Sequence, residues 1–86
     1  MYQDGTSYTM KVAARLRELR RKMNYSQEYM AMVLDISQNT YSRLENGKTP
    51  ITVYRLYDIC HIFETSPCVF LESLEMVEEN QVDRRW

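Results

Sequence analysis

Residues 38–43 place four hydrogen-bonding side chains close together: Gln38, Asn39, Ser42 and Arg43. A glutamine or asparagine carboxamide can make two hydrogen bonds to adenine, an arginine guanidinium can make two to guanine, and a serine hydroxyl can bond to several bases. Residues three and four apart are neighbours on a helix surface, so this spacing brings the four side chains together. A solvated helix face also carries polar residues, and the flanking elements must decide between the two interpretations.

The flanking residues predict two short helices joined by a tight turn. Ser26 has the residue type of a helix N-cap, and the helix that follows it ends before Asp35. Ser37 is the next N-cap. The second helix ends at about residue 46, and Gly47 stands just beyond this end. Asp35 tolerates the left-handed backbone that such a turn needs. The pattern predicts a helix-turn-helix, in which the second helix enters the major groove of DNA.

Apolar residues at helical spacing predict three further helices around this pair. One begins at Thr9, one follows an N-cap at Thr52, and one begins at Pro67 after Ser66. The 86 residues include only two Gly and two Pro, too few for the turns of an all-β domain. We therefore expect an all-α fold with one domain at residues 9–79, a flexible N-terminal tail at residues 1–8 and a C-terminal tail at residues 80–86.

The net charge of −1 hides an asymmetry along the chain. Residues 1–50 carry eight Lys and Arg against five Asp and Glu, whereas residues 51–86 carry three against seven. Six of the cations fall within residues 11–22. A basic front and an acidic back suit a protein that binds a polyanion with one side, although a solvated helix face would give the same count.

Three segments carry a specific resemblance: RLRELR at residues 15–20, SQE at 26–28 and DISQNTYSRLENGK at 35–48. They resemble the Cro/cI-type (XRE-like) helix-turn-helix family, and the resemblance extends over about residues 10–72. It implies a compact five-helix fold like that of lambda-repressor DNA-binding domains, with the helix-turn-helix at helices 2 and 3. Asp35 and Glu64 stand where the family tends to have Gly, and Tyr41 stands where it prefers Ile or Val.

The resemblance also implies a role for each matched residue. The positions that contact bases are Gln38, Asn39, Ser42 and Arg43. The positions that contact the sugar-phosphate backbone are Gln27, Thr40, Asn46 and Lys48. Arg20 and Glu45 match a pair that commonly forms a salt bridge between the first helix and the end of the third, which would support the recognition helix.

A single helix-turn-helix makes few contacts, and such proteins usually bind two half-sites about 34 Å apart as dimers. We therefore expect a homodimeric, sequence-specific transcriptional repressor that binds a double-stranded DNA operator. The fifth helix is apolar on two faces, one of which would cover the core while the other forms a dimer interface. The candidate residues for this dimer interface are Val69, Phe70, Leu74, Met76 and Val77.

Two other functions fit the same residues. The chain could be an antitoxin or a restriction-modification controller that regulates its own gene together with a protein partner. It could also be a protein-interaction module that reuses the fold, although such a module has no need of the basic front or of the side chains on the third helix.

The chemistry that the sequence lacks sets further expectations. We find no nucleophile–base pair, no carboxylate dyad and no phosphate-binding Gly loop, so we expect no enzyme and no cofactor. Cys60 and Cys68 each lie in an apolar stretch and are expected to be buried side chains rather than a disulfide or metal ligands. No apolar run approaches the length of a membrane span and no signal peptide is recognisable, which predicts a cytoplasmic protein.

Overall fold

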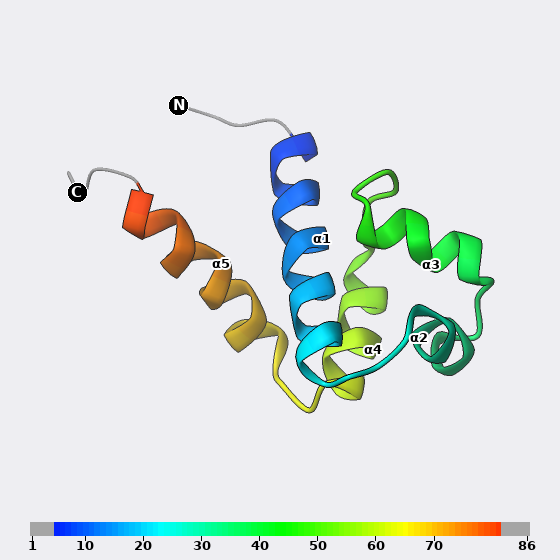
Figure 1. Ribbon diagram of the computed structural model, residues 1–86. Helices are drawn as coiled ribbons and strands as arrows, with labels where there is room; N and C mark the ends of the chain where they lie inside the picture. The colour runs from blue at the N-terminus through cyan, green and yellow to red at the C-terminus, as the bar shows by residue number, and fades with distance from the viewer. Residues whose placement is uncertain (1–4, 82–86) are drawn as a thin grey trace.

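The computed structural model describes the backbone of residues 5–81 and the side chains of residues 8–74. Five helices make up this part of the chain, and it contains no strand. Figure 1 shows α1 at the centre, with α2 and α3 on one side and α5 on the other. The prediction of an all-α, five-helix fold is confirmed. The helices are α1 (Gly5–Lys22), α2 (Gln27–Leu34), α3 (Gln38–Glu45), α4 (Val53–Ile62) and α5 (Pro67–Gln81).

Hydroxyl side chains begin the last four helices. In each case the hydroxyl oxygen accepts a hydrogen bond from the backbone N–H three residues further on, at 2.9–3.2 Å. These bonds satisfy N–H groups that the first turn of a helix leaves without a partner, and so they fix where each helix starts. The capping residues are Ser26, Ser37, Thr52 and Ser66.

The first helix is longer than the sequence suggested. α1 begins at Gly5 instead of Thr9, so residues 5–8 belong to the helix rather than to a flexible tail. The ammonium of Lys11 lies 5.4 Å from the ring centroid of Tyr8, one helical turn away, and this cation–π contact favours the extra turn. At the other end α5 continues to Gln81, two residues into the expected tail. Residues 1–4 and 82–86 of the two predicted tails lie outside the described residues.

Left-handed residues end several of the helices. Asp35 terminates α2 with φ 60° and ψ 46°, and its N–H points to the carbonyls of Ala31 and Met32. Glu64 follows α4 with φ 55°, and Gly47 follows α3 with φ 72°. A Cβ at Gly47 would stand 2.3 Å from the sulfur of Met10. The φ and ψ of Asp35 confirm the left-handed turn that the sequence predicted there.

The buried core lies between α1 and the helix-turn-helix pair. Tyr41 on α3 is completely buried, with the aliphatic side chains of α1, α2 and α4 around it. Cys60 is buried as expected, but Cys68 is exposed, because it lies in the first turn of α5 on the side away from buried Phe70. The fully buried residues of this core are Leu16, Met30, Tyr41 and Ile59.

Candidate nucleic-acid interface

The predicted base-contacting side chains lie along α3, from its first residue, Gln38, to Arg43. Gln38, Asn39 and Arg43 are exposed, and Ser42 is half-buried. Tyr41 and Leu44 of α3 are buried in the core, and their packing fixes the orientation of the helix. The helix therefore presents two carboxamides and one guanidinium to solvent along one side, the donors and acceptors that match the base edges in the major groove.

The predicted phosphate-contacting residues lie around the same helix. Thr40, Asn46 and Lys48 are exposed, and Gln27 at the start of α2 is half-buried. The Thr40 hydroxyl accepts a hydrogen bond of 2.8 Å from Ser37 Oγ. These residues flank α3 at its N-terminus, at its C-terminus and on the neighbouring helix.

A buried carboxylate joins three helices beneath this surface. Glu45 is 1% exposed, and Arg20 on α1 donates to both of its oxygens, through Nε to Oε2 and through Nη2 to Oε1. Gln27 Nε2 donates to Oε1 at 3.0 Å, and the Tyr41 hydroxyl donates to Oε2 at 2.8 Å. We call Arg20, Gln27, Tyr41 and Glu45 the Glu45 cluster. Its hydrogen bonds hold α1, α2 and α3 in one arrangement.

The electrostatics of the cluster follow from burial and hydrogen bonding. Burial acts to raise the pKa of Glu45, but hydrogen bonds from Arg20, Gln27 and Tyr41 outweigh it and hold the pKa below its ordinary value. Burial and the neighbouring carboxylate raise the pKa of Tyr41. Glu45 is therefore an anion and Tyr41 a neutral donor at physiological pH.

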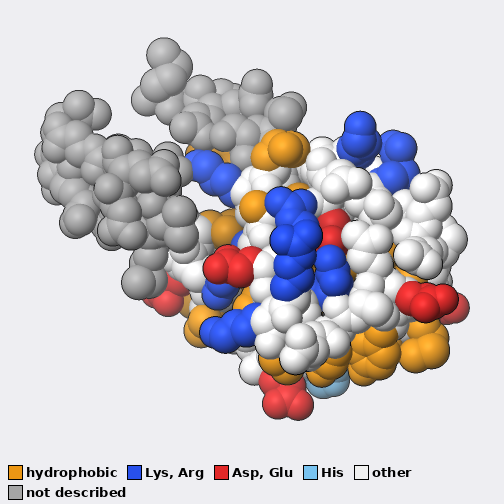
Figure 2. Space-filling view, viewed as in Figure 1, with side chains coloured by type: hydrophobic (Ala, Val, Ile, Leu, Met, Phe, Trp, Pro, Cys, Tyr) orange, Lys and Arg blue, Asp and Glu red, His pale blue; other side chains and the backbone are white. Residues whose placement is uncertain are grey.

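Lys and Arg side chains form a basic surface along α1. Figure 2 shows Lys and Arg side chains gathered over α1 and at the upper right, over α3 and the loop that follows it. Arg20, Arg21 and Lys22 occupy the last turn of α1. Arg17 Nη1 donates to the backbone carbonyl of Glu45 at 3.0 Å, which ties α1 to the C-terminal end of α3. The basic front inferred from the sequence is thus adjacent to α3.

Sequence reasoning anticipated only part of this arrangement. It paired Arg20 with Glu45, and the structure contains that pair. It missed the Tyr41 hydroxyl, the Gln27 amide and Arg17 as further hydrogen-bond donors to Glu45. One signal was available for Tyr41, because a phenol at an inward position of a helix needs a polar partner.

The proposed dimer residues of α5 divide between core and surface. Phe70 is 2% exposed and belongs to the core, so its assignment to a dimer interface is wrong. Val69 is exposed and Leu74 half-buried. The side chains of Met76 and Val77 lie outside the described residues.

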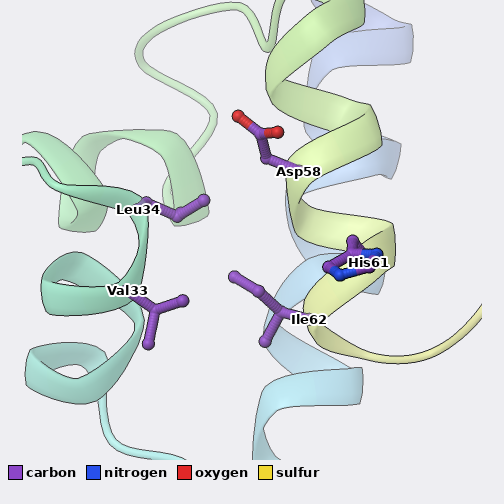
Figure 3. Close-up of a pocket in the computed structure, with 5 residues that line it drawn as sticks. All are labelled: Val33, Leu34, Asp58, His61 and Ile62. Carbon is purple, nitrogen blue, oxygen red and sulfur yellow. The ribbon is translucent and has the colours of Figure 1, made fainter.

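A shallow recess of about 260 Å³ lies between α2 and α4. In Figure 3, Ile62 projects from α4 toward Val33 and Leu34 on α2, and Asp58 and His61 lie along α4 beside it. These five residues include no Ser, Cys or Lys nucleophile.

Among the described residues no three His, Cys, Asp or Glu side chains gather as metal ligands. None of the helices within residues 5–81 is long and apolar enough to span a membrane.

The sequence matches the helix-turn-helix family model over residues 16–70. This match covers more than half of the chain and includes α2, α3 and the whole Glu45 cluster. The chain therefore belongs to the XRE-type helix-turn-helix family of DNA-binding transcriptional regulators. A search of curated proteins found no match.

Solved structures with the same fold include two regulators and part of a larger chain. The clp gene regulator ClgR from Corynebacterium glutamicum aligns with a TM-score of 0.76 and 22% identity over 85% of this chain and 78% of its own. The restriction-modification controller protein C.AhdI from Aeromonas hydrophila aligns with a TM-score of 0.68 and 22% identity, over 74% and 97%. Iron(II) HppE in complex with substrate aligns with a TM-score of 0.66 and 24% identity, over 72% and 36%. These identities establish a shared fold.

Proposed function

We propose that this protein is a homodimeric, sequence-specific transcriptional repressor whose α3 reads the major groove of an operator. The observation that carries the proposal is the contrast within α3. Its outward side chains, Gln38, Asn39 and Arg43, are exposed, while Tyr41 and Glu45 on the same helix are buried and hydrogen-bonded. A rigidly held helix with exposed base-reading groups is what direct readout requires.

Within this proposal the residues divide into two groups by the part of DNA they contact. Base edges are read by Gln38, Asn39, Ser42 and Arg43. Phosphates are contacted by Gln27, Thr40, Asn46 and Lys48, which fix the position of α3 without adding sequence information. The Arg20–Glu45 ion pair supports α3 from α1 and keeps the Glu45 carboxylate away from DNA phosphates.

The dimer follows from the number of contacts that one α3 can make. We propose that exposed Val69 and half-buried Leu74 on α5 contribute to a two-fold interface, together with Met76 and Val77. Figure 1 shows α5 diverging from α1 toward its C-terminal end. A two-fold dimer would place two copies of α3 in successive major grooves about 34 Å apart. Bound to an operator, the dimer blocks RNA polymerase sterically.

Fluorescence anisotropy with labelled duplex DNA tests the proposal. Arg43→Ala and Gln38→Ala should weaken binding to the preferred duplex by about 1–3 kcal/mol and relax the sequence preference. Arg21→Ala is the matched control, because it removes the same charge from an exposed position on α1. It should change affinity equally for preferred and scrambled duplexes. An unchanged sequence preference in Arg43→Ala and Gln38→Ala would refute the readout assignment.

A restriction-modification controller is the second candidate, since C.AhdI shares this fold over 97% of its chain. Its DNA-binding residues would be the same, and the difference lies in the target. A controller of this kind binds the DNA upstream of its own gene, so footprinting on that DNA separates the two functions. Protection there and nowhere else favours the controller.

A further inference from the structure

Tyr41 places a hydroxyl group in the buried core, where an apolar side chain would be enough for packing. The side chain is completely buried, and its hydroxyl donates a 2.8 Å hydrogen bond to Glu45 Oε2. A buried hydroxyl without a partner is unfavourable, so Tyr41 and Glu45 fix one another's orientation. Phenylalanine would fill the same space without constraining the carboxylate.

The Glu45 carboxylate accepts four hydrogen bonds, two at each oxygen. Arg20 and Gln27 donate to Oε1, and Arg20 and Tyr41 donate to Oε2. An ionised carboxylate offers about four lone-pair positions, so every one of them is occupied. With all positions filled, the carboxylate has one favoured orientation and acts only as an acceptor.

This orientation determines how Gln27 faces solvent. Its Nε2 donates one N–H to Glu45 Oε1 at 3.0 Å, which fixes which end of the planar amide points at the carboxylate. Within residues 8–74 its second N–H has no hydrogen-bond partner, and the side chain is half-buried at the start of α2. A phosphate oxygen only accepts hydrogen bonds, so an amide held with its NH₂ end in place is prepared to bind phosphate.

We propose that Tyr41 is a positioning residue for DNA binding, which acts through Glu45 to hold the Gln27 amide in its donor orientation toward a DNA phosphate. The inference rests on the proposed phosphate contact of Gln27. It adds that a buried phenol, which touches no DNA, contributes to affinity but carries no sequence information.

A double-mutant cycle on duplex DNA tests the inference. Tyr41→Phe should weaken binding about threefold to tenfold, the range that one hydrogen bond contributes, with the base preference unchanged. In the Gln27→Ala background the same change should have no further effect, because the group that Tyr41 positions is absent. Tyr57→Phe, at an exposed tyrosine of α4, is the matched control and should bind as the wild type does.

A measurement on the wild-type protein keeps the test independent of the variant's folding. In NMR spectra, the Gln27 side-chain amide proton bonded to Glu45 should exchange with solvent more slowly than the second proton of the same amide. Fast exchange of both protons would overturn the inference.

The outcomes separate the inference from the function on which it rests. If Gln27→Ala weakens binding but Tyr41→Phe does not, the inference fails and the phosphate contact stands. An equal effect of Tyr41→Phe in both backgrounds also overturns it, because Tyr41 then acts by another route. If Gln27→Ala binds DNA as the wild type does, the phosphate contact itself is wrong and the inference fails with it.

Discussion

The outer and inner sides of α3 differ in what determines which residues they carry. On the outer side Gln38, Asn39 and Arg43 are exposed to solvent. On the inner side Tyr41 and Glu45 are buried; Tyr41 donates to Glu45, and Glu45 accepts from Arg20 on α1 and from Gln27 on α2. The difference teaches that one eight-residue helix can keep its exposed side chains separate from those that fix its position, as the proposed readout of DNA by α3 requires.

The largest expected effect is on the inner side. Glu45→Ala leaves the guanidinium of Arg20, which is only 12% exposed, without its carboxylate. Removing one partner of a buried ion pair should lower the free energy of unfolding by about 3–5 kcal/mol. Glu18→Ala is the control, because its ion pair with Arg15 is on the surface and should contribute less than about 1 kcal/mol. Urea unfolding measures both, and equal losses would contradict the distinction.

Acid should remove part of the same stabilisation. The pKa of Glu45 is lower in the folded protein than its ordinary value of 4.5, so the unfolded chain binds a proton first as pH falls. The stabilisation by Glu45 is therefore complete above about pH 4.5 and is lost as the pH falls through the folded pKa. Urea unfolding from pH 7 to pH 3 should show the gap between wild type and Glu45→Gln narrowing below pH 4.5. A constant gap would contradict this assignment.

The turn between the two functional helices should give a smaller effect in the opposite direction. Asp35 holds a left-handed conformation with φ 60°, which is strained for any residue with a Cβ. Asp35→Gly relieves that strain and should stabilise the protein by about 0.5–1 kcal/mol after the entropy of glycine is counted. Ala14→Gly, at an exposed position within α1, should instead destabilise by about 1 kcal/mol. Thermal unfolding distinguishes the two signs, and destabilisation by both would exclude strain at Asp35.

The smallest effect on stability is expected on the outer side of α3. Gln38→Ala, Asn39→Ala and Arg43→Ala should each change the free energy of unfolding by about 0.5 kcal/mol or less, because no buried contact is lost. The same variants should lose DNA affinity. A loss of several kcal/mol in stability from any of them would show that the outer side also supports the fold.

Local chemistry explains why much of the fold was predictable. The N-caps at Ser26 and Ser37 and the left-handed turn at Asp35 depend on residues within about four positions of one another, so the sequence displays them directly. The start of α1 was misplaced because residues 5–8 carry no strong apolar pattern, although the contact between Tyr8 and Lys11 favours the earlier start.

The support of α3 was less predictable because it depends on tertiary contacts. Gln27 and Glu45 are 18 positions apart and Arg17 and Glu45 are 28 apart, and no periodicity relates them. Two faces of α5 are apolar, and the sequence does not tell which of them packs on the core. Only the packed structure shows that Phe70 faces inward and Val69 outward.

Selection of bound sites from random duplex DNA at fixed salt tests the central claim most directly, that the outer side of α3 reads sequence. The account predicts one enriched motif with two half-sites about 34 Å apart, and a lost preference at the guanine positions for Arg43→Ala. Bound pools with no enriched motif, or the same motif from wild type and Arg43→Ala, would contradict it.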